Sequence, residues 1–546
     1  MPIASSNPPE IRTLENWKGL NQQGRRASIA DDEEWWNENL FAIGPGNFRS
    51  CWGRGPTLYT APAGTQILRM FFGFIGYPTP QFAAPGPPYG GRFGWMFISN
   101  GNIDQVDLDL GTVTTIRPNP LDSLWEPVAP QYWASAKVWR PRFFGSVAGQ
   151  SGGVLFGSPH GLYAWDGQTL TIPGDNAPDW LTDQAENDPS GPPTPMPQGL
   201  PGIYAMEVYN NRLWVAGKDV MSFSAPSNGA DFSSTSGGGS FGYFGDKLTY
   251  SFMDLAATAG YLYVLNDSST DLISNVQLIG SGTPEDPYVT NFNYQNIDPQ
   301  TGHRFPRPVG RIGRYLVQYG GETIYLMQGG DAEPIGGKTT NTYVTLDTSQ
   351  YLPTMAPASM FGFRVLLCNG RFTDPWGVTR NLLLMWHPVR ENPFWSVASQ
   401  GIEITNIGSY EQDGICTPYG TDGTTMFQLF AKPDPDLIKR YASKFISGNG
   451  MSKLTIKNAK RVYAEVHDNS GLGVSITGTL TARGGGVPGG SEDVAFDMPE
   501  GKLWDILGHG VSGAGVQLAL DLQSKSPDFT IERLHVAADE RTLFGA

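Results

Sequence analysis

The amino-acid sequence predicts an all-β protein: an irregular β-propeller, preceded by an N-terminal docking arm with a helix and followed by a C-terminal β-sandwich domain. Three observations lead to this prediction. Short segments that alternate apolar and polar residues, typical of strands with one buried face, recur along most of the chain. Glycine (69) and proline (43) are abundant among the 546 residues, and only 16% are charged, as expected for many short strands joined by loops. The hydrophobic fraction of 39% indicates a folded core and not a disordered chain.

Residues 31–43 form the segment near the N-terminus that is predicted to be helical. The segment begins with acidic residues, which suit the positive end of a helix dipole. Trp36, Leu40 and Ile43 then recur at helical spacing, and the Gly-Pro-Gly that follows ends the helix. We expect this helix to pack Trp36 and its neighbour Trp35 against a sheet.

Strand-like segments repeat through the middle of the chain. The strongest are centred near residues 97, 163, 214, 263, 325 and 384. Their spacing of roughly 50–60 residues is the length of a four-stranded propeller blade with its loops. The first is followed by Asn100-Gly101, the strongest short signal for a β-hairpin. No WD, kelch or Asp-box signature recurs from blade to blade, and a tandem of β-sandwiches would give a similar alternation.

We expect three parts in the chain. Residues 1–92 would form the N-terminal arm and docking helix, 93–430 the β-propeller, and 431–546 the C-terminal β-sandwich. Two long insertions interrupt the propeller pattern: 174–202 is acidic and rich in proline, and 227–245 is rich in glycine and serine. Loops of this length without strands of their own are usually functional or flexible, and either could reach a neighbouring subunit.

The charge balance, the cysteines and the N-terminal residues restrict the classes of function that the chain could have. With 37 Lys and Arg against 52 Asp and Glu, the formal net charge is -15, which disfavours gripping DNA phosphates but suits a passage through which DNA slides. The three cysteines form no disulfide framework and no CxxC motif. The N-terminus lacks the basic and apolar regions of a secretory signal. The longest apolar run in the early chain, residues 70–77, is too short to span a bilayer, so we predict synthesis in a cytoplasm and no membrane-spanning segment.

The sequence offers no convincing catalytic site, and we therefore predict no enzyme activity, no metal and no cofactor. The six histidines do not lie at metal-ligand spacing. Residues 332–339 match a loose phosphate-loop pattern, but a strand is expected at 340–346, where a phosphate loop requires a helix. Asp107 and Asp109 could serve a glycosidase, which needs two carboxylates within several Å. On an alternating strand they are more simply part of the solvent-exposed face.

Several segments together carry a resemblance to a known family. They are WKGLNQQ at 17–23, IADDE at 29–33, Asn37 to Leu40, NFRSCWG at 47–53, NRLWVAG at 211–217, SFSAP at 222–226 with Asp231-Phe232, and SPDFTIER at 526–533. The chain in these segments resembles the tail nozzle proteins of short-tailed bacteriophages (podoviruses), also called tail tubular protein B. The SFSAP segment departs from the family pattern, which usually has an acidic residue before the proline.

The resemblance implies a structural protein of the virion tail, synthesised in the host cytoplasm. Six copies would form a homohexameric ring, a tail nozzle or tail tube component, below the head-to-tail adaptor ring. Tail fibres or spikes would attach to its flank. The ring channel would retain the viral double-stranded DNA and then conduct it during ejection, without specific DNA binding.

Under this hypothesis, residues 16–55 contribute to the face that meets the adaptor or the next subunit. The candidate interface residues are Trp17, Arg25, Arg26, Trp35, Trp36, Arg49 and Trp52. Replacing Trp35 and Trp36 with alanine should then stop ring assembly.

Two other functions remain open on the sequence. One is a virion-associated glycan-binding or glycan-depolymerising β-propeller, which would need paired carboxylates in a pocket. The 15 tryptophans and 22 tyrosines could stack on sugars, although such residues more often mark cores and subunit interfaces. The other is a non-viral β-propeller scaffold that binds another protein.

Overall fold

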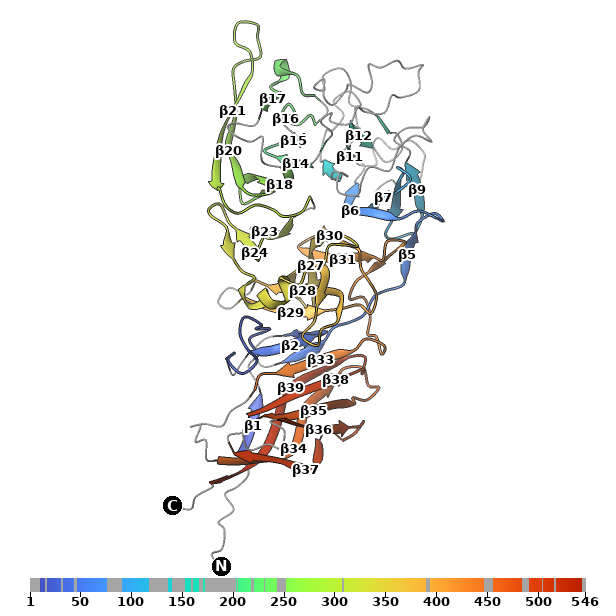
Figure 1. Cartoon of the computed structure of the whole chain (residues 1–546). Helices are drawn as coiled ribbons and strands as arrows, with labels where there is room; N and C mark the ends of the chain where they lie inside the picture. The colour runs from blue at the N-terminus through green and yellow to red at the C-terminus, as the bar shows by residue number, and fades with distance from the viewer. Residues whose placement is uncertain are drawn as a thin grey trace, which may run out of the picture.

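The structure is a computed structural model, and the strands of its described residues form eight sheets (Figure 1). It describes residues 10–14, 17–30, 33–43, 47–75, 91–116, 136–139, 153–158, 161–165, 170–171, 203, 205–217, 220–229, 231–242, 252–306, 309–388, 393–445, 455–483, 491–502, 504–514 and 517–542. Within these residues the helical segments are short: η3 (Ser234–Ser236), η5 (Gly337–Thr339) and α2 (Thr340–Tyr343). None of the described helices is long and apolar enough to cross a membrane.

Six sheets are antiparallel and four-stranded, and each is built almost entirely from one continuous stretch of chain. Their strands are β6 (Ile67–Ile75), β7 (Gly91–Ile98), β8 (Ile103–Asp107), β9 (Val113–Ile116); β10 (Ala136–Trp139), β11 (Gly153–Ser158), β12 (Gly161–Trp165), β13 (Leu170–Thr171); β14 (Ala205–Tyr209), β15 (Arg212–Ala216), β16 (Val220–Phe223), β17 (Gly239–Gly242); β18 (Phe252–Thr258), β19 (Tyr261–Asn266), β20 (Thr270–Ile279), β21 (Val289–Asp298); β22 (Gly310–Ile312), β23 (Tyr315–Tyr319), β24 (Ile324–Met327), β25 (Glu333–Pro334); and β30 (Asn406–Gln412), β31 (Ile415–Thr421), β32 (Thr425–Gln428), β5 (Thr57–Thr60).

A seventh four-stranded unit is part of a larger sheet of nine strands. The order in that sheet is β26 (Thr354–Met360), β27 (Phe363–Thr373), β28 (Thr379–His387), β29 (Phe394–Ala398), β2 (Glu34–Glu38), β33 (Lys439–Ser443), β38 (Gln517–Ser524), β35 (Ile476–Arg483) and β36 (Ser491–Met498). The first strands of the seven units contact one another in a closed circuit: β6, β10, β14, β18, then the β22–β23 hairpin, β26, β30 and again β6. These units and their circuit are consistent with a β-propeller, in agreement with the sequence prediction.

The propeller circuit is completed by strands from distant parts of the chain. In the sheet of β30, β31 and β32 the fourth strand is β5, whose Thr60 pairs with Thr425 of β32. The next unit begins with β6. The structure therefore differs from the expected boundary between residues 92 and 93, because β5 and β6 already belong to four-stranded units. Local sequence patterns do not reveal such a pairing between distant strands.

The nine-stranded sheet continues from the propeller into the C-terminal part of the chain. β2 joins β29 in parallel, at the pair Glu38 and Val397, and joins β33 in antiparallel fashion on its other side. The last four strands of the sheet face a second sheet, and an apolar core lies between the two. The second sheet has the order β3 (Leu40–Ala42), β4 (Phe48–Ser50), β39 (Phe529–Thr542), β34 (Thr455–Asp468) and β37 (Trp504–Ala514), with β1 (Glu10–Leu14) also paired to β39.

The predicted N-terminal helix is wrong. Residues 34–38 and 40–42 are the strands β2 and β3, and Asn39 between them has a φ of 59°, which turns the chain. β2 lies inside the nine-stranded sheet, and Trp36 and Asn37, which point to opposite faces, are both fully buried. A strand buried on both faces carries large apolar residues without strict alternation, which local spacing does not distinguish from a helix.

Two other local predictions are corrected and one is confirmed. α2 occupies part of the segment 340–346 that was expected to be a strand. The insertion 227–245 contains η3 and the strand β17, whereas the insertion 174–202 lies outside the described residues. The hairpin at Asn100-Gly101 is present between β7 and β8, and Gly101 has a φ of 88°.

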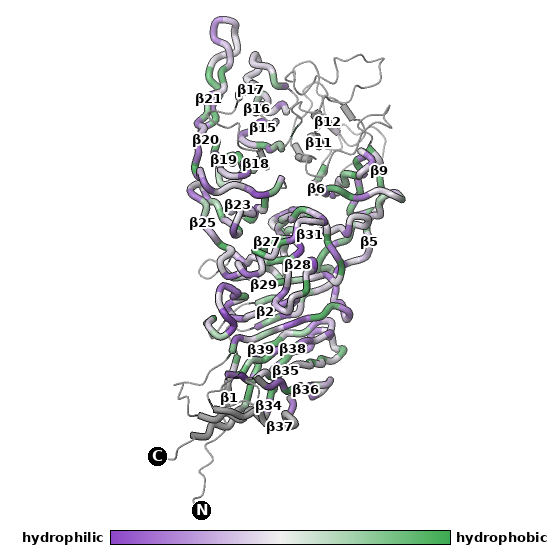
Figure 2. Tube along the Cα trace, viewed as in Figure 1, coloured by the Kyte–Doolittle hydropathy of each residue, from purple (hydrophilic) through white to green (hydrophobic). Residues whose placement is uncertain are grey.

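The hairpin of β20 and β21 extends beyond the propeller at the end opposite to the two termini (Figure 1). Its outer half exposes Leu278, Ile279 and Val289. Figure 2 shows that hydrophobic residues concentrate in the strands at the middle of the molecule, while the loop beside β2 is hydrophilic.

Candidate functional site

Several groups with catalytic or metal-binding chemistry in the described residues belong to the core or to turns. No group of three or more His, Cys, Asp or Glu side chains in that part of the chain is arranged to hold a metal ion. The three cysteines are free and buried, and burial raises the pKa of the Cys51 thiol to about 12. Burial lowers the pKa of His387 to about 3, so its ring is neutral where it contacts Ser396 at 2.7 Å.

The two aspartates considered for glycoside hydrolysis stabilise the turn after β8. Asp107 Oδ1 accepts hydrogen bonds from the backbone N–H groups of Asp109 and Leu110, both at 2.9 Å. Asp109 forms an ion pair with Arg92. Hydrogen bonding to Arg92 lowers the pKa of Asp109. These contacts account for both carboxylates as parts of the turn.

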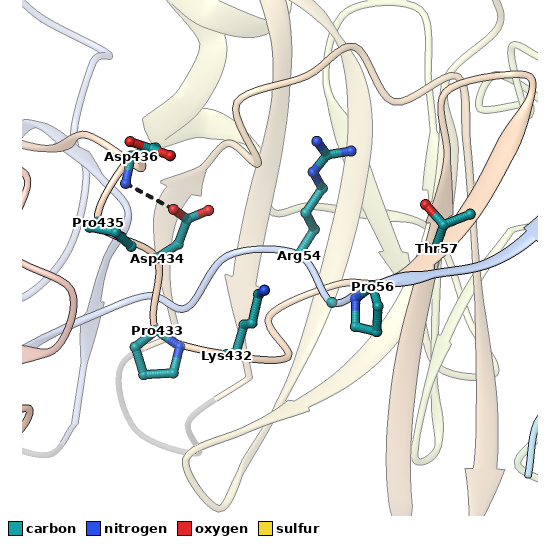
Figure 3. Close-up of a pocket in the computed structure, with 9 residues that line it drawn as sticks. Arg54, Pro56, Thr57, Lys432, Pro433, Asp434, Pro435 and Asp436 are labelled. Atoms are coloured by element: carbon teal, nitrogen blue, oxygen red, sulfur yellow. Dashed lines mark hydrogen bonds between the residues drawn. The ribbon is translucent and has the colours of Figure 1, made fainter.

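A polar cavity of about 440 Å³ lies where the chain enters and leaves the propeller (Figure 3). It is lined by residues 54–57 and 432–436, which contribute both basic and acidic side chains. The two segments are joined by a hydrogen bond from the backbone N–H of Gly53 to the carbonyl of Lys432 at 2.8 Å. The Asp436 N–H donates to Asp434 Oδ1 at 2.9 Å. The cavity is therefore part of the joint between two connections.

Two of the candidate interface residues, Arg26 and Trp35, belong to one continuous row of stacked side chains. In this row arginine guanidinium groups and aromatic rings contact one another in sequence, and we call it the Arg–aromatic ladder. Its members, in spatial order, are Arg483, Phe445, Arg26, Trp35, Trp376 and Arg440.

The ladder is assembled from distant parts of the chain. The Arg26 guanidinium lies 4.7 Å from the ring centre of Trp35 and 5.1 Å from that of Phe445. The Arg483 guanidinium also lies over the Phe445 ring, 4.7 Å from its centre. Trp376, in the turn between β27 and β28, meets Trp35 edge-on at 6.2 Å. Such cation–ring contacts each contribute about 0.5–1 kcal/mol at exposed sites.

The charges of the ladder are only partly neutralised. Arg26 forms an ion pair with Asp521 and donates to the carbonyl of Ser443 at 2.6 Å. Arg440 lies over Trp376 at 5.7 Å, and neither Arg440 nor Arg483 forms an ion pair with any residue that the structure describes. The ladder thus holds two arginines whose charge has no ion-pair partner within the described ranges of the chain.

Arg49 and Trp52 meet at a different place, around the carboxylate of Asp528. Arg49 Nη2 donates to Asp528 Oδ2 at 3.0 Å, and Trp52 Nε1 donates to the same oxygen at 3.1 Å. The Arg49 guanidinium also lies 4.3 Å from the ring centre of Phe361, in the turn between β26 and β27. This cluster joins the propeller unit of β26 to the C-terminal sheets.

Of the remaining candidate interface residues, Trp36 contacts the ladder, because its ring meets that of Trp376 edge-on at 6.1 Å. Trp17 is buried in the C-terminal core, 4.6 Å from the ring of Phe48, and Trp36 is fully buried in the core beneath β27 and β28. Arg25 is exposed on the loop before β2. Sequence reasoning missed Trp376, Arg440 and Arg483, although the Asp-Pro-Trp-Gly turn at 374–377 carries a recognisable turn signal with an exposed tryptophan.

Arginine side chains also cross the centre of the propeller. Arg311 of β22 pairs with Glu207 of β14, although the unit that begins with β18 lies between them. Arg69 of β6 donates to the carbonyl of Pro306, in the connection before β22, at 2.6 Å. The centre of the described propeller is therefore occupied by side chains.

Comparisons with known proteins add little beyond the fold. No protein-family model matches the chain, and no curated protein matches it either. Solved structures with distant similarity are β-propellers: the Cps50 (Swd1) β-propeller domain of Myceliophteria thermophila (10% identity, TM-score 0.33, 67% of this chain and 98% of that chain) and the WD40 domain of SCAP from fission yeast (7%, 0.28, 83% and 90%). Trypanosoma rangeli sialidase is similar to the same degree (9%, 0.28, 89% and 96%). Similarity at this level carries no argument about function.

Proposed function

We propose that this chain is a structural protein of a bacteriophage tail, a subunit of the tail nozzle whose ring retains and then conducts double-stranded DNA. The observation that carries the proposal is the position of the N-terminal segment that resembles the nozzle family. Its strand β2 connects the propeller to the C-terminal sheets, because it pairs with β29 on one side and with β33 on the other. Because one continuous hydrogen-bonded sheet joins the two parts, the subunit is suited to form the wall of a channel that must resist mechanical force.

The charge of the chain supports a passage for DNA. A net charge of -15 gives a wall that repels DNA phosphates, so that DNA moves along it without adhering. Arg69 and Arg311 reach across the propeller centre. The passage in this proposal therefore lies between the copies of a homohexamer and not through the centre of one propeller.

The proposed partners follow from the same assignment. The ring would meet the head-to-tail adaptor ring, and tail fibres or spikes would attach to its flank. The projecting β20–β21 hairpin offers such a flank, because its outer half exposes Leu278, Ile279 and Val289. The protein would be made in the host cytoplasm and reside in the virion tail.

Electron microscopy of the concentrated full-length protein, with two-dimensional class averages, tests the proposal. We expect six-fold rings with a central hole, alone or after addition of the adaptor ring. Binding or cleavage of a glycan by a monomer that forms no ring under either condition would overturn the structural role. It would favour the glycan-binding or glycan-depolymerising alternative.

A further inference from the structure

We infer that the Arg–aromatic ladder is a contact surface for a second copy of this chain, where Arg440 and Arg483 bind carboxylates of the neighbouring copy. The inference rests on the proposed ring and specifies one of its contact faces. The ladder runs along the junction between the propeller and the C-terminal sheets, so a copy seated on it would touch both parts at once.

The first argument is the unusual charge of the ladder within this chain. The chain carries 52 acidic against 37 basic residues, yet the ladder gathers three arginines, of which Arg26 is paired with the neighbouring Asp521. Arg440 and Arg483 have no ion-pair partner among the described residues. Arginines held over aromatic rings and left without a counter-charge are suited to bind a carboxylate from outside, because the planar guanidinium can donate two parallel hydrogen bonds.

The second argument is that the exposed tryptophan of the ladder, Trp376, is held in a rigid turn. Trp376 has 47% of its surface exposed, although it stands in a tight turn. Asp374 Oδ1 accepts the backbone N–H groups of Trp376 and Val378, both at 3.0 Å. Asp374 is fixed in turn by Arg380 Nε at 3.1 Å. A fixed, exposed tryptophan flanked by arginine is the kind of anchor that binds a partner at little cost in conformational entropy.

The third argument identifies the occupant as another copy. The unit formed by β22 to β25 exposes Glu333 in its outer strand β25, Asp331 just before that strand and Glu322 in the turn between β23 and β24. None of these three carboxylates forms an ion pair with a described residue. The chain itself therefore presents the exposed carboxylates that the ladder would accept. Complementary patches on one acidic chain allow specific contact between copies that otherwise repel each other.

Arginine and tryptophan together also occur in sites for single-stranded nucleic acid. The net charge of -15 and the carboxylate of Asp521 beside Arg26 disfavour that occupant. It nevertheless gives a defined alternative result in the experiment below.

The test compares the assembly of the full-length protein with that of the double variant Arg440→Glu/Arg483→Glu, by sedimentation velocity and electron microscopy. We expect the variant to need at least a tenfold higher concentration to assemble, and Trp376→Ala to weaken assembly in the same direction. The matched control is Arg54→Glu/Arg314→Glu, which changes the net charge equally at two exposed arginines outside the ladder. Unchanged thermal unfolding of each variant establishes that it is folded.

Each outcome decides a different point. Rings of the double variant that form as readily as those of the unchanged protein would overturn the ladder contact and leave the nozzle proposal standing. Equal weakening by the control would also overturn the ladder contact, because the effect would then follow net charge alone. A 40-nucleotide single strand that binds the unchanged protein and not the double variant would assign the ladder to nucleic acid. Absence of any assembly in the unchanged protein, with and without the adaptor ring, would overturn the ring itself.

Discussion

Arg49 and Asp528 are separated by 479 positions in the sequence, and their side chains form a two-point ion pair, Nη2 to Oδ2 at 3.0 Å and Nε to Oδ1 at 3.3 Å. Asp528 is nearly buried, and Trp52 and Asn469 also donate to its carboxylate. One carboxylate near the C-terminus thus fixes the N-terminal segment against the propeller and the C-terminal sheets. The stability of this joint is expected to depend on that single charge.

Replacement of Asp528 by asparagine should lower the free energy of unfolding by about 2–3 kcal/mol. The amide carries no charge for Arg49, and its NH₂ group would face hydrogen-bond donors. Urea denaturation followed by tryptophan fluorescence measures the change. Asp436→Asn, at an exposed carboxylate, is the control and should shift the midpoint little. Equal midpoints for Asp528→Asn and the unchanged protein would contradict the proposed importance of the joint.

The same carboxylate predicts a loss of stability in acid. Burial by itself would raise the pKa of Asp528, but hydrogen bonds from Arg49 and Trp52 outweigh it, so that its pKa lies below the ordinary value. A carboxyl whose pKa is lower in the folded state stabilises the fold above its unfolded pKa of about 4. That contribution is lost as the pH falls through the folded pKa. Between pH 6 and pH 3 the denaturation midpoint should fall more steeply for the unchanged protein than for Asp528→Asn.

Glu34 predicts the opposite dependence, a loss of stability as the pH rises from about 4.3 to about 8. Its side chain is fully buried in β2, Oε1 has no hydrogen-bond partner in the described part of the chain, and burial raises its pKa from 4.5 to about 8. The folded protein holds a proton that the unfolded chain releases above about pH 4.3, so stability falls as the pH rises from there through 8. A shift of this size corresponds to roughly 3–5 kcal/mol.

The variant Glu34→Gln should therefore be more stable than the unchanged protein at pH 9, and close to it at pH 5. Urea titrations at both pH values measure the difference, with Glu500→Gln as a control at an exposed carboxylate. An identical pH dependence for Glu34→Gln and the unchanged protein would contradict the prediction, because the ionisation of Glu34 would then not affect the stability of the fold.

Tryptophans that are close in space should differ sharply in their effect on stability. Trp36 is fully buried, and its replacement by alanine should cost about 3–5 kcal/mol, because it removes buried surface and leaves a cavity. Trp376 is half exposed, and Trp376→Ala should cost less than about 1.5 kcal/mol. Thermal unfolding distinguishes the two. Loss of assembly in a Trp35/Trp36 double variant would then reflect unfolding, so Trp376→Ala is the sharper probe of an interface.

Local features of the fold could be predicted from the sequence where the interaction itself is local. The Asn100-Gly101 hairpin depends on residues that adjoin in the chain, and so does the recurrence of four-stranded units. β2 was mistaken for a helix, because Trp36 and Asn37 are buried on opposite faces of a sheet whose other strands come from the far end of the chain. The local periodicity of residues 34–38 does not indicate that distant strands bury both faces of β2.

For the Asp528 cluster and the Arg–aromatic ladder, the sequence likewise indicates separate segments but not the contacts between them. The sequence around Arg49 and the sequence around Asp528 each carry part of the family resemblance, but the ion pair between the two residues is visible only in the folded structure. The ladder likewise joins Arg26, Trp376 and Arg483 from three distant segments. Because its members come from distant segments, a cluster of this kind has no regular residue spacing that could be recognised in a single sequence.

The pairing of β5 with β32 has a consequence for synthesis on the ribosome. Thr60 is made early, but its partner Thr425 emerges roughly 20–70 s later at about 5–20 residues per second. Until then β5 remains without its neighbour β32, and its unpaired edge is exposed to association with other nascent chains. Folding of this protein is therefore expected to be slow and largely post-translational, and to depend on chaperones that shield the early strands until the last ones arrive.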